Sequence, residues 1–355
     1  MARDKLCVGI DIGASSVKLC QLRRVKRGFA LEHFGLAPLP SEAIVDGAVM
    51  NASRVVDAIQ ELLATHGVRH KEVALSVSGH AVIIKKIALP QMTADELDES
   101  IQWEAEQFIP FDIQDVNIDV QIVRQQSTQA GQMDVLLVAA KKDLVNEYTS
   151  VIVEAGLTPL VCDVDAFAVE NMFEANYDMP SDRSIALVNV GAAKTNINII
   201  SGGISSFTRD LSTGGNAFTE EIQKQLNVSF EEAEGMKIAS GASSGDNTAA
   251  SYVPEVDRAV QIVAESVTTE VQRSIDFYAA TSAEAPPTHL YLTGGSARLM
   301  ALQKALERRL GVEVAVADPF RNVEISPQER DYLRAIAPAA AVVVGLALRY
   351  PGDGV

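Results

Sequence analysis

The feature that most constrains this chain is a pattern that occurs twice, half a chain length apart. Residues 8–18 read VGIDIGASSVK, and residues 187–197 read LVNVGAAKTNI. In each copy an apolar strand leads into a turn of Gly and small side chains, and a second strand follows. Such a turn lets the backbone approach an anion and point N–H groups at it. Asp11 and Asn189 hold the same place in the two copies, 178 residues apart, so the pattern predicts two similar lobes that close on one polyphosphate.

Composition bounds the size and the partners of the protein. The chain has 355 residues, of which 47% are hydrophobic, and a net charge of −17. Single cores stop growing near ~250–300 residues, so more than one domain is expected. Phosphate contacts along a nucleic acid need clustered Lys and Arg, so the acidic balance excludes a uniform nucleic-acid surface. One basic run, residues 23–27, indicates a solvated hairpin tip, with contact to an acidic lipid or a partner as the alternative.

The cysteines and histidines give no sign of a metal site. Cys7, Cys20 and Cys162 lie in apolar runs without metal-ligand spacing, and we expect three small buried side chains in a reducing compartment. No signal peptide is expected, because the first residues lead straight into a strand. The longest apolar run, residues 335–348, is shorter than the ~20 residues that span a bilayer. These observations predict a cytoplasmic protein.

The first part of the chain has the pattern of a mixed sheet flanked by helices. Alternating apolar residues predict a meander of three strands, at residues 7–12, 17–23 and 29–36. A helix is predicted to start at Asn51 or Ser53 and to stop at Gly67, and a strand follows at residues 73–77. Strands joined to a further strand by a crossover helix are typical of such a sheet.

Residues 81–158 are predicted to form an inserted unit, a small sheet that carries two helices. Thr93 and Glu96 form a capping-box pattern at the start of the first helix, and the second helix is predicted over residues 143–154. Phe108 continues the apolar stripe of the first helix, so we expect it in the core of the insert.

The second half of the chain repeats the order of the first. Its meander is predicted at residues 185–189, 196–200 and 205–210. Helices are predicted at residues 217–226, 230–240, 256–281, 299–310 and 338–348. Two strands, at residues 290–292 and 312–316, flank the fourth of these helices. The repeated meander supports a duplication more strongly than the two turns alone.

The first turn carries side chains suited to a metal-bound phosphate. Asp11 would hold a hydrated Mg²⁺, which keeps most of its waters and takes one or two carboxylates plus phosphate oxygens. Ser15 and Ser16 offer hydroxyl and N–H groups, and Lys18 could neutralise phosphate charge. The alternative is an ordinary hairpin, since a short motif of this kind also occurs by chance.

Three further features strengthen this interpretation. Gly294, Gly295 and Ser296 follow a strand and are predicted to open a helix, where a phosphate or a ring can approach the backbone. Glu234 and Lys237 lie one helical turn apart and could reach a ribose, with a surface ion pair as the alternative.

The third feature is a connector between a strand and a helix. Asp163 and Asp165 stand at this junction, where the helix dipole favours acidic side chains. Simple capping of the helix by Asp165 is the alternative.

The order of these features resembles that of the actin-like ATPase family, which includes actin, sugar kinases and the division protein FtsA. The resemblance covers nearly the whole chain. It implies an α/β fold of two actin-like (ribonuclease H-like) lobes with mixed sheets flanked by helices, an FtsA-like inserted small α+β subdomain, and a small subdomain in the second lobe. The first subdomain is implied to comprise residues 1–80, 159–184 and 337–355, and the insert residues 81–158. The second lobe is implied to comprise a subdomain of residues 185–214 and 286–336 and a small nucleotide-contacting subdomain of residues 215–285.

The resemblance also implies ATP or ADP and Mg²⁺ as ligands. The implied nucleotide contacts are Gly13, Ala14, Ser15, Ser16, Lys18, Gly191, Ala192, Lys194, Thr195, Gly214, Gly215, Glu234, Lys237, Gly294, Gly295 and Ser296. Asp11 and Asn189 would each hold the metal through a water molecule.

One departure from the family pattern concerns hydrolysis. Asn189 stands where hydrolysing relatives often carry Asp, and an amide cannot act as a base at neutral pH. Asp165 is then the remaining candidate for a catalytic residue. We expect slow or absent ATP hydrolysis.

One branch of the family is more similar than the rest. Residues 103–111, WEAEQFIPF, resemble a signature of the PilM family of type IV pilus assembly proteins, as do residues 38–40 with Gly47 and residues 163–165. The resemblance implies a cytoplasmic ATP-binding scaffold that holds the N-terminal tail of the inner-membrane protein PilN in a groove between the first subdomain and the insert. It implies membrane association only through partners, which could include other platform proteins, motor ATPases and further copies of the chain.

Two other functions of the same fold stay open from the residues alone. A small-molecule kinase would need a further catalytic Asp near the γ-phosphate, and only Asp165 and Asp210 are candidates. An FtsA-like filament protein would need an amphipathic membrane helix at its end, and residues 349–355 do not have that pattern.

Overall fold

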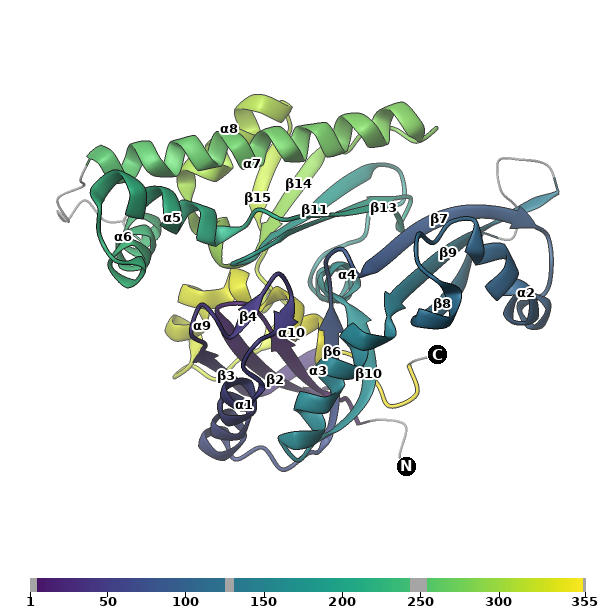
Figure 1. The fold of residues 1–355 in the computed structure, drawn as a ribbon, viewed down its shortest axis with the longest axis horizontal. Coiled ribbons are helices and arrows are strands. Elements are labelled where there is room, and N and C mark those ends of the chain that lie inside the picture. Colours follow the sequence, from purple (N-terminus) through teal and green to yellow (C-terminus); the bar gives the residue numbers. More distant parts are fainter. Residues whose placement is uncertain (1–4, 125–130, 243–253, 354–355) are drawn as a thin grey trace.

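Two lobes and one smaller unit make up the protein. The computed structural model describes residues 5–124, 131–242 and 254–353. Figure 1 shows the two lobes stacked on each other, with the smaller unit beside them on the right. Each lobe is built round one mixed β-sheet, and the smaller unit has a sheet of its own.

The two main sheets have the same topology. The first has the order β10-β6-β1-β2-β3-β16. Its strands are β1 (Val8–Ile12), β2 (Ser16–Arg24), β3 (Phe29–Pro38), β6 (Glu72–Val77), β10 (Thr158–Val164) and β16 (Val323–Glu324). The second has the order β13-β12-β11-β14-β15. Its strands are β11 (Ser184–Val190), β12 (Thr195–Ser201), β13 (Ile204–Leu211), β14 (His289–Thr293) and β15 (Glu313–Val316).

Strand directions and register confirm the duplication. In both sheets the first three strands form an antiparallel meander, and the fourth and fifth strands add in parallel on the far side of the first. Asp11 pairs with Lys18 across the first hairpin, and Asn189 pairs with Asn196 across the second. The two copies of the pattern therefore form corresponding hairpins, with Asp11 and Asn189 at equivalent positions.

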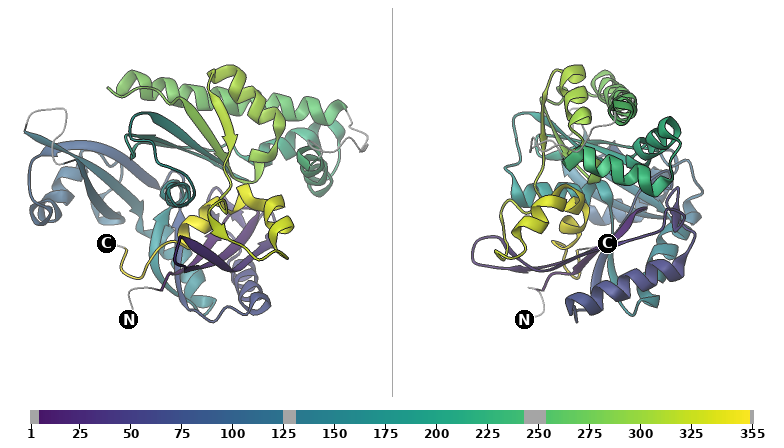
Figure 2. Two further views of the ribbon diagram at one scale, coloured as in Figure 1. Left: turned by 180° about the vertical axis from the view of Figure 1, so that it is seen from behind. Right: turned by 90° about the vertical axis from the view of Figure 1, so that its left-hand side faces the viewer.

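Helices separate the two sheets and cover their outer faces. Helices α1 (Ala52–His66) and α3 (Lys142–Glu154) pack on the outer face of the first sheet, and α7 (Pro254–Thr281) and α8 (Met300–Leu310) on that of the second. Helices α4 (Asp165–Asn176) and α10 (Ala341–Leu346) lie between the sheets, as Figure 2 shows. These six helices and two sheets thus bury apolar residues on both faces of the central strands.

Strand alternation explains why each central strand serves two cores. Val8 and Ile10 contact the outer core under α1, whereas Cys7 contacts the core between the sheets. Successive side chains of a strand point to opposite faces, so the odd positions of β1 face the other lobe. Asp11 is one of these odd positions, which directs its carboxylate to the interlobe side of the sheet.

The two central helices cross at very close range. Gly345 of α10 lies directly against the backbone of Ala168 in α4, and a side chain at that position would collide with the Ala168 carbonyl group. Only glycine leaves room for this crossing. The approach brings both helices into the layer that joins the lobes.

The smaller unit is a three-stranded sheet with one helix. Its strands, β7 (Val82–Pro90), β9 (Gln132–Lys141) and β8 (Val116–Arg124), stand in that order, and α2 (Ala94–Glu106) packs on them. The capping box of Thr93 and Glu96 forms as predicted. Phe108 is only half-buried and packs at the border of this core, and Trp103 is 80% exposed.

The insert carries one helix, and not the two that were expected. Tyr148 and Ile152 of α3 pack into the core of the first sheet. The duplication gives the reason, because α3 joins β6 to β10 as α8 joins β14 to β15. The insertion therefore interrupts the connection before α3, and residues 142–158 belong to the first lobe.

A second segment also packs away from its expected place. Residues 318–336 were assigned to the second lobe, but β16 pairs with β3, and Phe320 and Leu333 are buried in the core between the sheets. The remaining elements are β4 (Ile44–Val45), β5 (Ala48–Val49), α5 (Gly215–Leu226), α6 (Phe230–Ala242) and α9 (Arg330–Ile336), with 3₁₀ turns at Ile113–Asp115, Gly295–Arg298 and Ala337–Ala340.

The cysteines fit the expectation in two cases out of three. Cys7 and Cys20 are buried, and Cys162 is exposed because it points outward from the edge strand β10. Across the part of the chain that the structure describes, no helix is long and apolar enough to cross a membrane.

Candidate functional site

The first turn is a tight hairpin whose strands place an ion pair beside it. The Gly13 N–H group donates to the Ser16 carbonyl oxygen at 3.1 Å, which closes the turn between β1 and β2. Lys18 Nζ donates to Asp11 Oδ2 at 2.9 Å, and both side chains are largely buried. The register of the hairpin sets this contact, since the two residues stand opposite each other. The turn thus presents backbone amides next to a paired carboxylate and ammonium group.

The second turn repeats this geometry with neutral side chains. The Gly191 N–H group donates to the Lys194 carbonyl oxygen at 2.9 Å. Asn189 Nδ2 donates to Asn196 Oδ1 at 3.0 Å, and Asn189 Oδ1 accepts from the Thr293 hydroxyl at 3.2 Å. Both polar atoms of Asn189 are therefore engaged within the second lobe.

Two side chains of the second lobe reach across to the first. Lys194 Nζ donates to the Ser78 carbonyl oxygen at 2.8 Å, and Asp210 Oδ2 accepts the Gly79 N–H group at 2.5 Å. Asp210 Oδ1 also accepts from Asn196 Nδ2 at 2.8 Å, which links this contact to the second turn. The lobes meet beside both turns.

A third carboxylate lies at the connector between the lobes. Asp165 Oδ1 accepts a hydrogen bond from the Ser76 hydroxyl at 2.6 Å. Burial, together with the neighbouring Asp11 and Asp210 carboxylates, raises the pKa of the Asp165 carboxyl to about 6, although hydrogen bonds from Ser76 and Ser78 act against this shift. Asp165 is the first residue of α4 and the N-cap is Val164, so a capping role does not explain this side chain.

The three carboxylates fit a hydrated cation. The Asp11 and Asp210 carboxylates both disfavour ionisation of Asp165, and a divalent ion would relieve this repulsion. Across the described ranges no group of three or more His, Cys, Asp or Glu forms a ready cage for a metal. Mg²⁺ needs no such cage, because it binds through its waters to one or two carboxylates and to phosphate.

Glu234 and Lys237 of α6 face inward, so their ion pair is not on the surface. Lys237 on α6 is 9% exposed, and its Nζ donates to the Gly215 carbonyl oxygen at 3.1 Å and to the Thr219 hydroxyl at 2.9 Å. Glu234 Oε2 is 2.6 Å from the same ammonium group. Burial lowers the pKa of Lys237, although the Glu234 carboxylate acts against this shift.

The Gly-Gly-Ser turn lies next to this helix pair. Ser296 Oγ is 2.5 Å from the point that a Cβ on Gly215 would occupy, so α5 and the turn after β14 are in close contact. The Gly215 N–H group donates to the Gly191 carbonyl oxygen at 2.7 Å. Gly295 and Ser296 open a short 3₁₀ turn and not the α-helix that was expected, with α8 starting at Met300.

Several polar residues at this site were not singled out from the sequence. Ser76, Ser78 and Gly79 follow one another at the end of β6, and Thr219 lies one helical turn after Gly215. Asp210 pairs with Asn196 in the β12–β13 register. From the sequence Asp210 was considered only as a candidate acid of a kinase, and this register places it beside the second turn.

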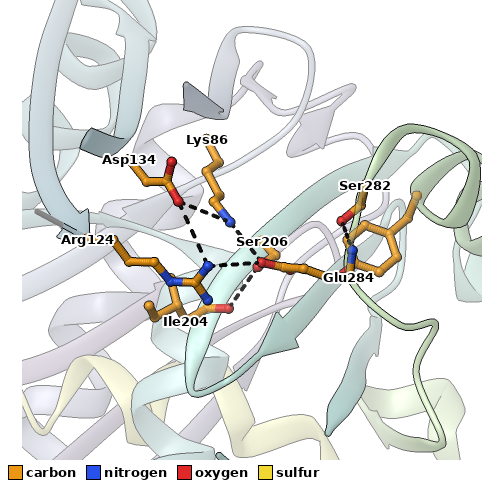
Figure 3. Close-up of polar contacts among 8 residues, drawn as sticks. Lys86, Arg124, Asp134, Ile204, Ser206, Ser282 and Glu284 are labelled. Atoms are coloured by element: carbon orange, nitrogen blue, oxygen red, sulfur yellow. Dashed lines mark hydrogen bonds and ion pairs between the residues drawn. The ribbon is translucent and has the colours of Figure 1, made fainter. Parts of the chain in front are cut away.

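The insert contacts the second lobe through a charged cluster. Lys86 Nζ is 2.9 Å from Glu284 Oε1 and 3.7 Å from Asp134 Oδ2. Arg124 lies 3.6 Å from Glu284, and the Tyr278 hydroxyl donates to Glu284 Oε2 at 2.9 Å. Figure 3 shows Glu284 facing the three charged side chains of the insert. Hydrogen bonds from Lys86 and Tyr278 lower the pKa of Glu284 although burial opposes them.

A cleft of about 620 Å³ opens beside this cluster. It lies between β7 of the insert and β13 of the second lobe, and Phe108, Phe207 and Phe277 line it. The two strands run close together at the edges of their sheets (Figure 1). This cleft is not at the place where the resemblance led us to expect a partner groove, between the first subdomain and the insert.

Fold and site together define a class of protein. Two lobes of one topology, each with a glycine-containing hairpin turn where the lobes meet, are the defining features of the actin-like fold. Residues 9–350 match the family described as type IV pilus assembly protein PilM. The chain belongs to this family.

Solved structures and curated relatives agree with this assignment. The chain is similar to a chain of the "PilM-PilN type IV pilus biogenesis complex", with 30% identity and a TM-score of 0.85 over 97% of this chain and 98% of that one. MreB5 of Spiroplasma citri bound to AMPPNP has 11% identity and a TM-score of 0.50 over 96% of this chain and 94% of that one, a likeness of fold alone. Cell division protein FtsA of Neisseria meningitidis serogroup B is 24% identical over 292 residues, 75% of this chain and 69% of that protein.

Proposed function

We propose that the chain is an ATP-binding scaffold of the type IV pilus inner-membrane assembly platform. The observation that carries the proposal is that the two lobes meet beside both turns, where the Lys194–Ser78 and Asp210–Gly79 hydrogen bonds join them. The backbone N–H groups of residues 13–16 would bind phosphate oxygens from one side, and those of residues 191–195 would bind them from the other. Gly214, Glu234, Lys237 and Ser296 would hold the nucleoside.

The metal would lie among the carboxylates at the base of the cleft. Asp11 would hold a Mg²⁺ water while Lys18 keeps the carboxylate oriented. When bound, Mg²⁺ would neutralise phosphate charge between the lobes. Asn189 would contribute less than Asp11, because Asn196 and Thr293 already engage its amide.

ATP hydrolysis is proposed to be slow. A general base must accept a proton from the attacking water, and an amide at position 189 cannot do so. Asp165 is the remaining candidate base, but its carboxylate already accepts hydrogen bonds from the Ser76 and Ser78 side chains, which hold it away from the role of proton acceptor. A phosphate-release assay giving more than ~1 s⁻¹, the low end of ordinary turnover, would contradict this proposal.

The partner is proposed to be the N-terminal cytoplasmic tail of PilN, which would hold the protein at the inner face of the membrane. Support comes from the similar chain in the PilM-PilN complex. The tail would lie as an extended peptide in the groove between the first subdomain and the insert, using backbone pairing and apolar pockets.

A peptide-binding assay tests both parts of the proposal. A fluorescent peptide of the PilN tail is titrated with the protein, with and without ATP and Mg²⁺. We expect binding that nucleotide strengthens, because closure of the lobes would favour one arrangement of the insert. The Asp11→Ala variant should lose the nucleotide effect and keep the basal peptide affinity. No binding of the peptide under any condition would contradict the scaffold function.

A further inference from the structure

A pocket of about 360 Å³ lies on the first lobe, formed by residues 318–337. Buried apolar side chains form its floor: Phe320, Val323, Leu333 and Ala337. None of the residues that line this pocket belongs to the proposed nucleotide site. Nucleotide binding between the lobes therefore does not account for this pocket.

Three arginines surround the pocket. Arg330 and Arg334 lie one turn apart on α9, and Arg321 comes from the loop before β16. Within the described residues none of the three has a carboxylate within 4.0 Å, and Arg321 lies over the ring of Tyr177. The one acid that lines the pocket, Asp318, accepts the Phe320 N–H group at 2.9 Å. Positive charge thus prevails at the opening.

The basic hairpin found in the sequence adjoins this pocket. β16 pairs with β3 so that Val323 stands opposite Phe29, and Gly28 at the hairpin tip lies against the Asn322 carbonyl group. Lys26 and Arg27 of this tip are exposed. Neither forms an ion pair with any residue in the described ranges.

Five unpaired cations therefore gather on one region of a protein whose net charge is −17. Like charges held together repel one another, and a bound anion removes that repulsion. The planar fork of a guanidinium group matches phosphate oxygens in a bidentate way. The pocket volume is in the range of small-molecule sites, and its apolar floor suits the carbon part of a phosphate ester.

We propose that this pocket binds a phosphate ester, carried by an anionic phospholipid headgroup or free in solution. Arg330 and Arg334 bind the phosphate from α9, Arg321 binds it from the loop before β16, and Lys26 and Arg27 add long-range attraction. The site is separate from the interlobe cleft and does not depend on nucleotide binding there.

Two binding measurements test the proposal and separate the two sources. The first is flotation of the full chain with vesicles of phosphatidylcholine, with or without phosphatidylglycerol. The second is a calorimetric titration with glycerol 1-phosphate. The test variant is Arg330→Gln/Arg334→Gln, and Arg321→Gln probes the loop before β16. Lys304→Gln/Arg309→Gln removes the same charge from exposed positions of α8 and is the control.

We expect the Arg330/Arg334 double variant and the Arg321 variant each to weaken binding about tenfold or more, and the control to bind as the wild type does. Binding should also weaken as salt is raised. If the arginine variants lose binding to phosphatidylglycerol vesicles, the source is a lipid. If they lose binding only to glycerol 1-phosphate, the source is soluble. Absence of binding by the wild type to both probes, or an equal loss in the control, overturns the proposal. All the substituted side chains are exposed, so thermal unfolding should be unchanged.

Discussion

Lys194 Nζ donates a 2.8 Å hydrogen bond to the main-chain carbonyl oxygen of Ser78, and this contact fastens the second turn to the first lobe. The cation that would neutralise phosphate is therefore already placed where the lobes meet. Replacing it should affect both closure of the lobes and nucleotide affinity.

The Lys194→Met variant tests this relationship. We expect ATP affinity to fall by about tenfold and the free energy of unfolding to fall by about 1–3 kcal/mol, because the partly buried Ser78 carbonyl group loses a charged donor. Calorimetric titration with ATP and urea unfolding measure the two effects. Lys224→Met on α5 is a matched control, since Lys224 is exposed and makes only a helical i,i+3 contact. Unchanged ATP affinity in the Lys194 variant would show that this lysine does not serve the nucleotide.

Burial of two carboxyl groups predicts a pH dependence of stability. The pKa is raised by burial to about 6 for Asp165 and to about 7 for Glu170, whose Oε2 accepts from Asn198. The folded state holds these two protons more tightly than the unfolded state does, so protonation favours folding. The stabilising contribution is therefore complete below about pH 4 and is lost as the pH rises through 6 and 7, at up to about 1.4 kcal/mol per pH unit for each proton.

The Glu170→Gln variant isolates one of these groups. Urea unfolding between pH 4 and 7 should show a shallower loss of stability in the variant than in the wild type. The side chain of Asn198 keeps an acceptor in the variant, so the fold should be retained. Identical slopes in the two proteins would mean that Glu170 titrates normally.

The insert should be energetically coupled to the second lobe through Glu284. Lys86 and Glu284 lie 2.9 Å apart with side chains 20% and 18% exposed, so solvent screens this pair less than a surface pair. A double-mutant cycle with Lys86→Met and Glu284→Gln should give a coupling energy of about 1–3 kcal/mol. Arg273 and Glu270 on α7 form an exposed i,i+3 pair that serves as the control, with an expected coupling below about 0.5 kcal/mol. Equal coupling in the two cycles would contradict a structural link between insert and lobe.

The helix crossing at Gly345 predicts a strong effect of a single side chain. A Gly345→Val substitution should separate α10 from α4 and cost at least about 3 kcal/mol, at the upper end for overpacked cores. Gly235→Val is the control, because a side chain at that helical glycine of α6 would meet open space. Differential scanning calorimetry measures both. Similar unfolding temperatures for the two variants would show that the crossing can widen at little cost.

The sequence was most informative where the two halves repeat. The spacing of Asp11 and Asn189 predicted two hairpins of one topology, and the structure confirms it down to the pairing of Asp11 with Lys18. Local patterns also predicted the capping box at Thr93. These features depend on neighbouring residues or on a repeat, and both can be recognised along the chain.

The sequence was least informative about which surface a helix covers. The apolar stripe of α3 fits either the insert or the first sheet, and only the topology places Tyr148 in the first lobe. Asp210 is the second-last residue of β13, and the Gly79 N–H group that it accepts belongs to the other lobe. Contacts between distant segments, including Lys86 with Glu284, leave no local pattern.

The most direct test of the account is a crystal structure of the protein with a non-hydrolysable ATP analogue and Mg²⁺ at saturating concentration. We expect the triphosphate between residues 13–16 and 191–195, with the metal bound through water near Asp11. The nucleoside should lie between α6 and the turn at residues 294–296. An empty cleft at saturating ligand, or a nucleotide bound elsewhere on the protein, would contradict the account.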